Sequence, residues 1–231
     1  MAKSNKKQSK KDDRNIVAVE EALSKSEQFI ERNQNAIIYS VAIVVLLIAG
    51  YIGYTRFVLG PRERDARAEM FMAEKYFERG DFELALEGDG EYLGFLDIIT
   101  NFRMTKSANL SRYYAGISLM RLGEWEEGID HLKRFRTRDQ LLGAMAYGAI
   151  GDAYWELEDL QRAARYYRKA YQHKPDRLTT PAFLMKAGLL YEHKGEYAEA
   201  LRLYERIQKE YSDTSEGRDI EKYIARAKAR Q

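Results

Sequence analysis

The strongest constraint on how this chain can fold is an uninterrupted apolar stretch near its N-terminus. Residues 36–54 read AIIYSVAIVVLLIAGYIGY and contain no charged side chain. A helix needs roughly 20 residues to cross a hydrocarbon core about 30 Å thick, and this stretch is that long. It lacks the polar face that a core helix of this length normally shows. The sequence therefore predicts a transmembrane helix over residues 36–58.

A cleaved signal peptide is a poor explanation for this stretch. It is preceded by 35 residues, far more than a charged n-region needs, and the bulky Tyr51 and Tyr54 stand where cleavage would require small side chains. We therefore expect a permanent, single-pass anchor in contact with membrane lipid. Ala49 and Gly53 form a small-xxx-small pair that predicts a packing site for a partner helix, although such pairs are also common in membrane helices without one.

Charges on either side of the anchor predict its orientation. Arg56, Arg62 and Arg64 follow the apolar stretch of residues 36–54. Lysines precede it at five early positions: Lys3, Lys6, Lys7, Lys10 and Lys11. Because long domains translocate largely regardless of their charge, the early lysines have the larger weight. We predict that the N-terminus lies in the cytoplasm and that the C-terminal domain lies outside it.

The residues before the anchor divide by composition. Residues 1–14 are mostly polar or charged and cannot bury enough apolar surface to order themselves, which predicts a flexible basic cytoplasmic tail. Residues 15–35 carry apolar side chains at near-helical spacing, among them Ile16, Leu23 and Ile30. They predict an amphipathic juxtamembrane helix that lies on the membrane or on a neighbour. A plain extension of the anchor helix is the alternative.

Beyond the anchor, related segments recur at intervals of 43, 35 and 37 residues. They are RGDFELAL at Arg79, LGEWEEGI at Leu122, LEDLQRAA at Leu157 and KGEYAEAL at Lys194. One corresponding position in the four copies is occupied by Gly80, Gly123, Glu158 and Gly195. A period of about 34 residues is typical of stacked helical hairpins. The longer first interval indicates an insertion, which we place at residues 87–94.

The third copy carries a recognisable repeat signature. It falls on the pattern W-x2-L-G-x2-Y…A-x3-F…P at these positions: Tyr147, Ile150, Gly151, Tyr154, Ala163, Tyr167, Ala170 and Pro175. It resembles a tetratricopeptide repeat, in which small residues at Gly116, Gly151 and Gly188 would let the second helix of each hairpin approach closely. The first copy departs from the pattern at Glu69 and Asp89, which leaves its pairing geometry open.

This resemblance implies a fold for the whole chain. We expect an all-α protein with a single transmembrane helix followed by a tetratricopeptide-like α-solenoid. The repeat domain would occupy residues 62–213 with about four helical hairpins. A capping helix over residues 214–231 would cover its last apolar face.

In such an array the first helices of successive hairpins line a concave surface. Registering each copy on its small residue places nine side chains there: Met70, Phe77, Tyr113, Ile117, Met120, Met145, Trp155, Met185 and Leu189. Four of them are methionine, an unbranched and polarizable side chain that suits surfaces accepting varied apolar segments. We predict a groove that binds extended or partly folded polypeptide. Packing against neighbouring hairpins is the alternative for any single residue.

The sequence offers no chemistry for catalysis. It has no cysteine and no Gly-Lys-Ser or Gly-Lys-Thr phosphate-binding loop. His131, His173 and His193 have no His or Cys companion at ligand spacing. The formal net charge of +2 gives no basic excess that would indicate nucleic-acid binding. We therefore expect neither an enzyme nor a bound metal or cofactor.

A Lys-rich tail, one anchor and a repeat array together resemble the YfgM-like family, whose members are ancillary subunits of the bacterial Sec translocon. The segment EEALSKSEQFIERNQ ahead of the anchor is similar to the juxtamembrane stretch of that group. The resemblance implies a bacterial inner-membrane protein with a periplasmic C-terminal domain near SecYEG. It also implies partnership with a PpiD-like membrane-anchored chaperone and a holding role for newly translocated secreted or outer-membrane proteins.

The alternative is a structural scaffold that joins fixed subunits of a secretion, motility or envelope complex and meets no unfolded clients. The two functions differ in a measurable way. A client-holding domain delays the aggregation of an unrelated unfolded protein, whereas a dedicated scaffold does not.

Overall fold

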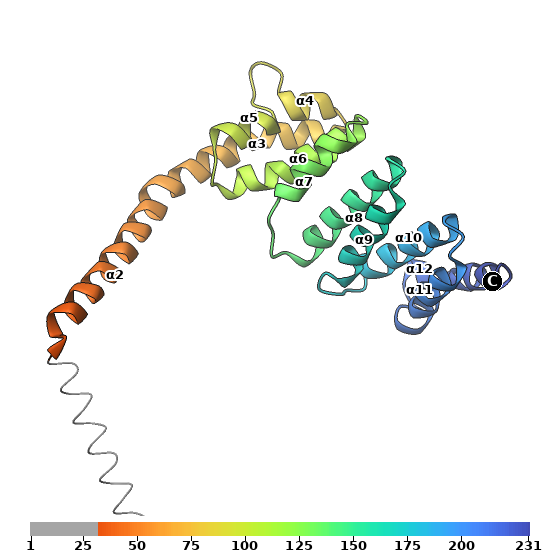
Figure 1. Cartoon of the computed structure of the whole chain (residues 1–231). Coiled ribbons are helices and arrows are strands. Elements are labelled where there is room, and N and C mark those ends of the chain that lie inside the picture. Colours follow the sequence, from red (N-terminus) through yellow and green to blue (C-terminus); the bar gives the residue numbers. More distant parts are fainter. Residues whose placement is uncertain (1–31) are drawn as a thin grey trace, which may run out of the picture. The chain divides into compact units, whose positions relative to one another are not determined.

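Figure 1 shows the protein as a computed structural model, which describes residues 32–231. The chain divides between Val58 and Leu59 into two compact units. Among the described residues every regular element is helical, and the single β-bridge joins Gly88 to Leu93. The predicted basic tail over residues 1–14 and nearly all of the predicted juxtamembrane helix over residues 15–35 lie outside the described residues.

The first unit contributes α2, which spans Gln34–Tyr54. Its 21 residues correspond to roughly 31 Å of helix, close to the thickness of a hydrocarbon core. None of its side chains is buried against protein, and Leu46 and Leu47 are 71% and 69% exposed. By length and composition it is a candidate membrane span, and the described residues contain no second one. A short π-helical segment, η1 (Thr55–Leu59), follows it in the chain.

The second unit is a stack of short helices. They are α3 (Gly60–Arg79), α4 (Phe82–Glu87), α5 (Phe95–Asn101), α6 (Lys106–Arg121), α7 (Trp125–Arg134), α8 (Gln140–Glu156), α9 (Leu160–Gln172), α10 (Thr179–His193), α11 (Tyr197–Glu210), α12 (Ser215–Arg218) and α13 (Ile220–Lys228). The pairs α6 with α7, α8 with α9, and α10 with α11 form helical hairpins, and each hairpin packs on the next. α12 and α13 pack against α11 at the C-terminal end, where Ile220 and Ile224 are buried. The predicted all-α fold, a long apolar helix followed by a solenoid of helical hairpins, is confirmed.

The first copy is an irregular hairpin. α3 pairs with α4, a helix of only 6 residues, and the predicted insertion at residues 87–94 forms the tight connection between α4 and α5. Gly94 makes this connection possible, because a Cβ there would lie 2.1 Å from the Leu86 carbonyl oxygen. α5 then packs against α6, and its fully buried Phe95 and Ile98 belong to a small core shared by α3, α4, α5 and α6.

Glycines set the distance between the two helices of a hairpin. A Cβ added at Gly151 would lie 2.7 Å from the Tyr167 ring. One added at Gly188 would lie 2.3 Å from the Tyr204 ring. Gly116 meets the second helix of its hairpin equally closely. Such distances leave no room for a side chain, so the predicted close approach at these small residues is confirmed.

The turn between the two helices has the same backbone conformation in every copy. Its φ is 85°, 87°, 58° and 76° at the four corresponding positions: Gly80, Gly123, Glu158 and Gly195. Glycine adopts this left-handed conformation readily, whereas a residue with a side chain does so at a cost of roughly 1–2 kcal/mol. The recurring segments are therefore four copies of one turn, and Glu158 is the strained member.

Glu158→Gly is expected to raise the free energy of unfolding by about 0.5–1 kcal/mol. Relief of the left-handed strain should exceed the entropy that glycine adds to the unfolded chain. Gly195→Glu introduces the same strain and is expected to lower stability by a similar amount. Urea titration of both variants, followed by circular dichroism, measures the changes. A Glu158→Gly variant no more stable than the unmodified protein would contradict the assignment of strain to Glu158.

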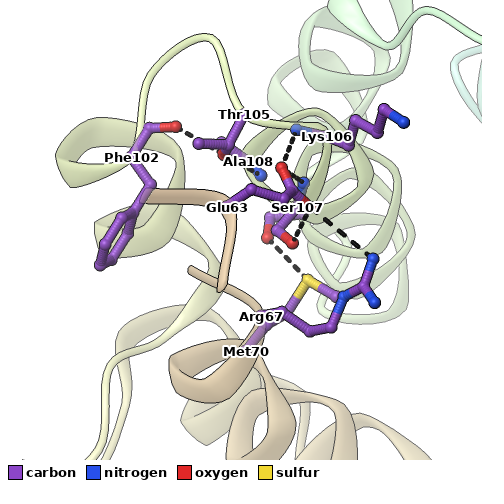
Figure 2. Close-up of polar contacts among 9 residues, drawn as sticks. Glu63, Arg67, Met70, Phe102, Thr105, Lys106, Ser107 and Ala108 are labelled. Atoms are coloured by element: carbon purple, nitrogen blue, oxygen red, sulfur yellow. Dashed lines mark hydrogen bonds and ion pairs between the residues drawn. The ribbon is translucent and has the colours of Figure 1, made fainter. Parts of the chain in front are cut away.

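A carboxylate on α3 holds the start of α6, as Figure 2 shows. Glu63 Oε2 accepts hydrogen bonds from the backbone N–H groups of Lys106 at 2.5 Å and Ser107 at 3.4 Å. Its Oε1 accepts one from the Ser107 hydroxyl at 2.9 Å. Thr105 caps the same helix end by accepting a hydrogen bond from the Ala108 N–H. The first N–H groups of a helix lack partners within it and carry partial positive charge, so Glu63 stabilises α6 while tying it to α3.

Glu63→Ala is expected to lower the free energy of unfolding by about 1–2 kcal/mol, because it leaves the start of α6 with fewer hydrogen-bond acceptors. The matched control is Asp65→Ala, which removes an exposed carboxylate from the same helix and should change stability by less than about 0.5 kcal/mol. Thermal unfolding of both variants makes the comparison. Equal losses would mean that Glu63 contributes only its charge.

Candidate functional site

The first helices of the last three hairpins, α6, α8 and α10, surround a groove of about 870 Å³. Its apolar lining consists of Ile117, Met120, Leu122, Trp125, Ala149, Trp155 and Leu189. Its charged lining consists of Arg121, Asp152, Glu156 and Lys186. The groove therefore combines apolar walls with a few charges, which is the usual composition of a binding site.

Four of the nine side chains predicted to line a binding surface meet in this groove: Ile117, Met120, Trp155 and Leu189. They come from three helices that are far apart in the sequence and adjacent in the stack. The indole of Trp155 lies 6.2 Å from the Tyr167 ring and 6.0 Å from the His193 ring, measured between centroids. Trp155 is thus held in place by neighbouring rings.

Three other predicted residues pack inside the N-terminal part of the array. Met70 and Tyr113 are buried, at 5% and 7% exposure. The Phe77 ring makes edge contacts with Phe95 and Tyr114, at centroid distances of 6.4 and 5.0 Å. Phe95 belongs to α5, the helix that the irregular first copy adds. An aromatic cluster therefore occupies this end of the predicted surface.

The last two predicted residues are methionines outside the lining of the groove. Met185 is half-buried against the larger core, and Met145 is 45% exposed on α8. Of the four methionines predicted for the binding surface, Met120 is the one in the lining, and it is itself only 7% exposed. The apolar character of the groove comes mainly from tryptophan, isoleucine and leucine.

A charged network crosses the apolar lining. The Tyr167 hydroxyl donates a hydrogen bond to Asp152 at 2.7 Å, and Lys186 Nζ lies 2.7 Å from each oxygen of the same carboxylate. Burial of Tyr167, reinforced by the Asp152 charge, raises the pKa of its hydroxyl, which therefore remains a donor at neutral pH. The side chains of Lys186 and Asp152 are 43% and 41% exposed, so both remain accessible to a ligand.

This charged network was not predicted from the sequence, although a signal was present. Before its terminal Glu156, α8 contains a single acidic residue, Asp152, and α10 contains a single lysine, Lys186. A lone charge on an apolar helix has to face solvent or a partner, since burying it alone is very unfavourable. Pairing these two positions required knowing how α8 and α10 cross.

The groove can bind polypeptide through two kinds of contact. Its apolar walls can bury hydrophobic side chains, a gain of roughly 25 cal/mol per Å². Asp152 and Lys186 can accept from and donate to main-chain amides of the ligand. Among the described residues, no cluster of three or more His, Cys, Asp or Glu side chains is placed to hold a metal ion.

A second pocket, of about 840 Å³, lies between α7, α8 and α9. Its lining is rich in carboxylates: Glu126, Glu127, Asp130, Glu158 and Asp159. The Tyr154 hydroxyl accepts hydrogen bonds from Lys133 at 3.0 Å and Arg162 at 3.5 Å. Burial alone would raise the pKa of Tyr154, but these two cations outweigh it and lower the pKa. None of the predicted binding residues lines this acidic pocket.

Stacked hairpins around an apolar groove define a helical-repeat protein. A tetratricopeptide-repeat family model matches residues 113–177, and a second tetratricopeptide-repeat model matches residues 182–214. The chain therefore contains tetratricopeptide repeats over these residues, and repeats of this type form protein-interaction modules. This fold typically serves as an interaction scaffold and not as a catalyst.

Solved structures share the fold at low sequence identity. One is the structure of TPR-like repeats from a Podosopora anserina protein assigned as a kinesin light chain, whose own repeats are nearly identical to one another. It is 16% identical in sequence to this chain, with a TM-score of 0.56 over 73% of this chain and 87% of that one. MamA protein is 20% identical, with a TM-score of 0.51 over 71% of this chain and 91% of that one. Identities this low show the fold alone. A search of curated proteins finds no match.

Proposed function

We propose that this chain is a membrane-anchored module whose groove between α6, α8 and α10 holds extended or partly folded polypeptide. The observation that carries the proposal is the groove itself, in which Ile117, Met120, Trp155 and Leu189 converge from three helices beside an accessible ion pair. Apolar contact without a shape-specific slot suits clients of varied sequence.

The proposed location follows from α2 and from the resemblance to the YfgM-like family. α2 crosses the bacterial inner membrane once, with the N-terminus in the cytoplasm and the repeat unit in the periplasm. The repeat unit then works beside SecYEG with a PpiD-like membrane-anchored chaperone, and its clients are newly translocated secreted or outer-membrane proteins. The exposed apolar surface of α2 supports a lipid environment.

Ala49 and Gly53 are the proposed seat for a partner helix in the membrane. A Cβ added at Gly53 would meet nothing within 4 Å, so this face of α2 is open in the structure. Small residues allow two membrane helices to approach closely. A membrane-anchored chaperone or a translocon subunit is the proposed occupant.

Photocrosslinking from two positions in native membranes tests the proposal. A crosslinker at Trp155 is expected to capture secreted or outer-membrane polypeptides, and one at Ala49 is expected to capture SecYEG or a membrane-anchored chaperone. The control position is Phe71, which is 56% exposed on α3 and lies outside the lining of the groove. If neither Trp155 nor Ala49 yields such products above the Phe71 control, the Sec-associated function is wrong.

A fixed structural scaffold predicts a different pattern. One defined subunit would crosslink to Trp155 whatever proteins are being secreted. The repeat unit would then have no effect on the aggregation of an unrelated unfolded protein. A delay of aggregation that is lost when Trp155 is changed supports client holding over the scaffold.

A further inference from the structure

One edge of the repeat unit gathers the loops that enter the first helices. The loops before α6, α8 and α10 lie along this edge, which can be followed in Figure 1. The Asn109 side chain donates a hydrogen bond to the Arg136 carbonyl and accepts one from the Arg136 N–H. Lys174 Nζ donates to the Arg138 carbonyl. The three loops therefore form one connected surface, which we call the loop edge.

The loop edge is basic. Its three loops expose the following Lys and Arg side chains: Arg103, Lys106, Arg136, Arg138, Lys174 and Arg177. The same loops contain two acidic residues, Asp139 and Asp176, and both accept hydrogen bonds from backbone N–H groups at the starts of α8 and α10. Asp213 of the following loop pairs with Arg177. Asp139, Asp176 and Glu63 occupy the N-terminal ends of the three helices, and the Lys and Arg side chains that remain leave the edge positive, so it attracts anions.

Exposed apolar side chains stand among these charges. Met104 is 75% exposed, Leu178 is 68% exposed and Leu141 is 40% exposed. Met104 also has a φ of 72°, an unfavourable backbone for a residue with a side chain. Apolar side chains flanked by Lys and Arg are typical of surfaces that insert shallowly into a membrane interface.

Two turns on the opposite edge carry the contrary charge. Glu124 precedes α7 and Glu127 lies in its first turn, beside the exposed Arg121, while Glu156 and Glu158 lie at the end of α8. The turns of the first and last copies carry both signs. The net charge of +2 therefore hides a separation of basic and acidic side chains between two edges of the unit. A membrane surface responds to such a local patch and not to the total charge.

The loop edge is also the edge at which the chain arrives from α2. Arg62 donates to the Asn101 carbonyl at 2.7 Å, and Glu63 accepts from the Lys106 N–H, as Figure 2 shows for the latter. Both residues belong to the first turn of α3, and η1 alone separates α3 from α2 in the sequence. Only a few residues of chain therefore separate α2 from the residues that contact this edge.

We infer that the loop edge rests on the anionic headgroup surface of the membrane that α2 crosses, with Met104, Leu141 and Leu178 inserted among the headgroups. The inference rests on the proposed function in requiring α2 to span a bilayer. Each basic side chain near an anionic surface strengthens the contact about fivefold. Because salt screens these charges, the contact weakens at high ionic strength.

Single-cysteine labelling tests the contact directly, since the chain has no cysteine of its own. An environment-sensitive fluorophore is attached at Leu178→Cys, and a control fluorophore at Glu158→Cys on the opposite edge. The full chain is reconstituted into vesicles of phosphatidylcholine alone, or of phosphatidylcholine and phosphatidylglycerol in equal amounts. We expect a blue shift at Leu178 in the mixed vesicles only, reversed by high salt, with no shift at Glu158. Equal signals at both positions, or none at Leu178, overturn the inference.

Charge variants and extraction separate this inference from the proposed function. Combined Arg103→Ser, Lys106→Ser and Arg138→Ser should weaken the contact roughly hundredfold. The matched set of Glu124→Ser, Glu127→Ser and Glu156→Ser should not weaken it.

Extraction with alkaline carbonate tests whether α2 spans the bilayer. A chain released from the vesicles by this treatment lacks a spanning α2, which contradicts the proposed function as well. A chain that stays while the Leu178 fluorophore does not respond contradicts the loop-edge contact alone. A response to added acidic protein or RNA in place of phosphatidylglycerol also overturns the inference.

Discussion

Trp155→Ser is expected to weaken the binding of unfolded polypeptide roughly 30- to 1,000-fold. This range corresponds to the loss of about 2–4 kcal/mol that follows truncation of a central aromatic anchor in an interface. Trp155 lines the groove and is positioned by the rings of Tyr167 and His193, so its indole is already ordered before a ligand binds. A preordered side chain loses little entropy on binding. Titration of reduced, carboxymethylated lactalbumin, a permanently unfolded probe, by fluorescence anisotropy measures the change.

Two controls distinguish the groove from general stickiness. Phe71→Ser removes an aromatic ring of 56% exposure on α3 and should leave the affinity unchanged. Met145→Ser measures whether the ligand continues along α8 beyond the lining of the groove. Circular dichroism establishes that each variant is folded. If folded Trp155→Ser binds the unfolded probe as tightly as the unmodified protein, the groove is not where polypeptide binds.

The sequence predicted the repeat register well because the register depends on local chemistry. A left-handed turn requires glycine or a strained residue, and a close helix contact requires a small one. Both requirements place glycines at regular intervals in the sequence, such as Gly123 and Gly195 in the turns and Gly151 and Gly188 at the contacts. The glycine positions located the first helix of each hairpin. Four of the residues predicted from that register line the groove.

The lining of the groove was predicted less completely because its extent depends on contacts between distant segments. The pattern could not show that an inserted helix, α5, would place Phe95 against Phe77 and fill one end of the surface. Nor could it show that Asp152 of α8 would meet Lys186 of α10, since that pairing depends on how the two helices cross. Registering each copy on its small residue therefore gave four side chains that meet in the groove, and it could not give the burial of the others.

The distribution of charge also could not be predicted from the sequence alone. The whole-chain charge of +2 argued against nucleic-acid binding, and it also concealed that the loop edge and two turns on the opposite edge carry charges of contrary sign. Loops before first helices and turns inside hairpins alternate along the sequence, so their charges cancel in any sum. Only the hairpin topology sorts them onto separate edges.

Gly151→Ala is expected to lower the free energy of unfolding by about 1–3 kcal/mol, although alanine favours helix by roughly 1 kcal/mol over glycine. The added Cβ would lie 2.7 Å from the Tyr167 ring. That ring cannot easily withdraw, because Tyr167 is 1% exposed and its hydroxyl is bonded to Asp152 at 2.7 Å. Thermal unfolding should show a decrease of about 2–4 °C in Tm for each kcal/mol lost.

Two further variants show whether the loss comes from packing. Tyr167→Leu in the Gly151→Ala background removes the opposing ring, so the double variant should be more stable than the sum of the single changes predicts. Gly195→Asn should be nearly neutral, because asparagine tolerates the left-handed turn and a Cβ there meets nothing within 4 Å. Strict additivity of Gly151→Ala and Tyr167→Leu would place the loss elsewhere in α8. Since Tyr167 also holds Asp152, the Gly151→Ala change should weaken polypeptide binding together with stability, which links the packing of this hairpin to the shape of the groove.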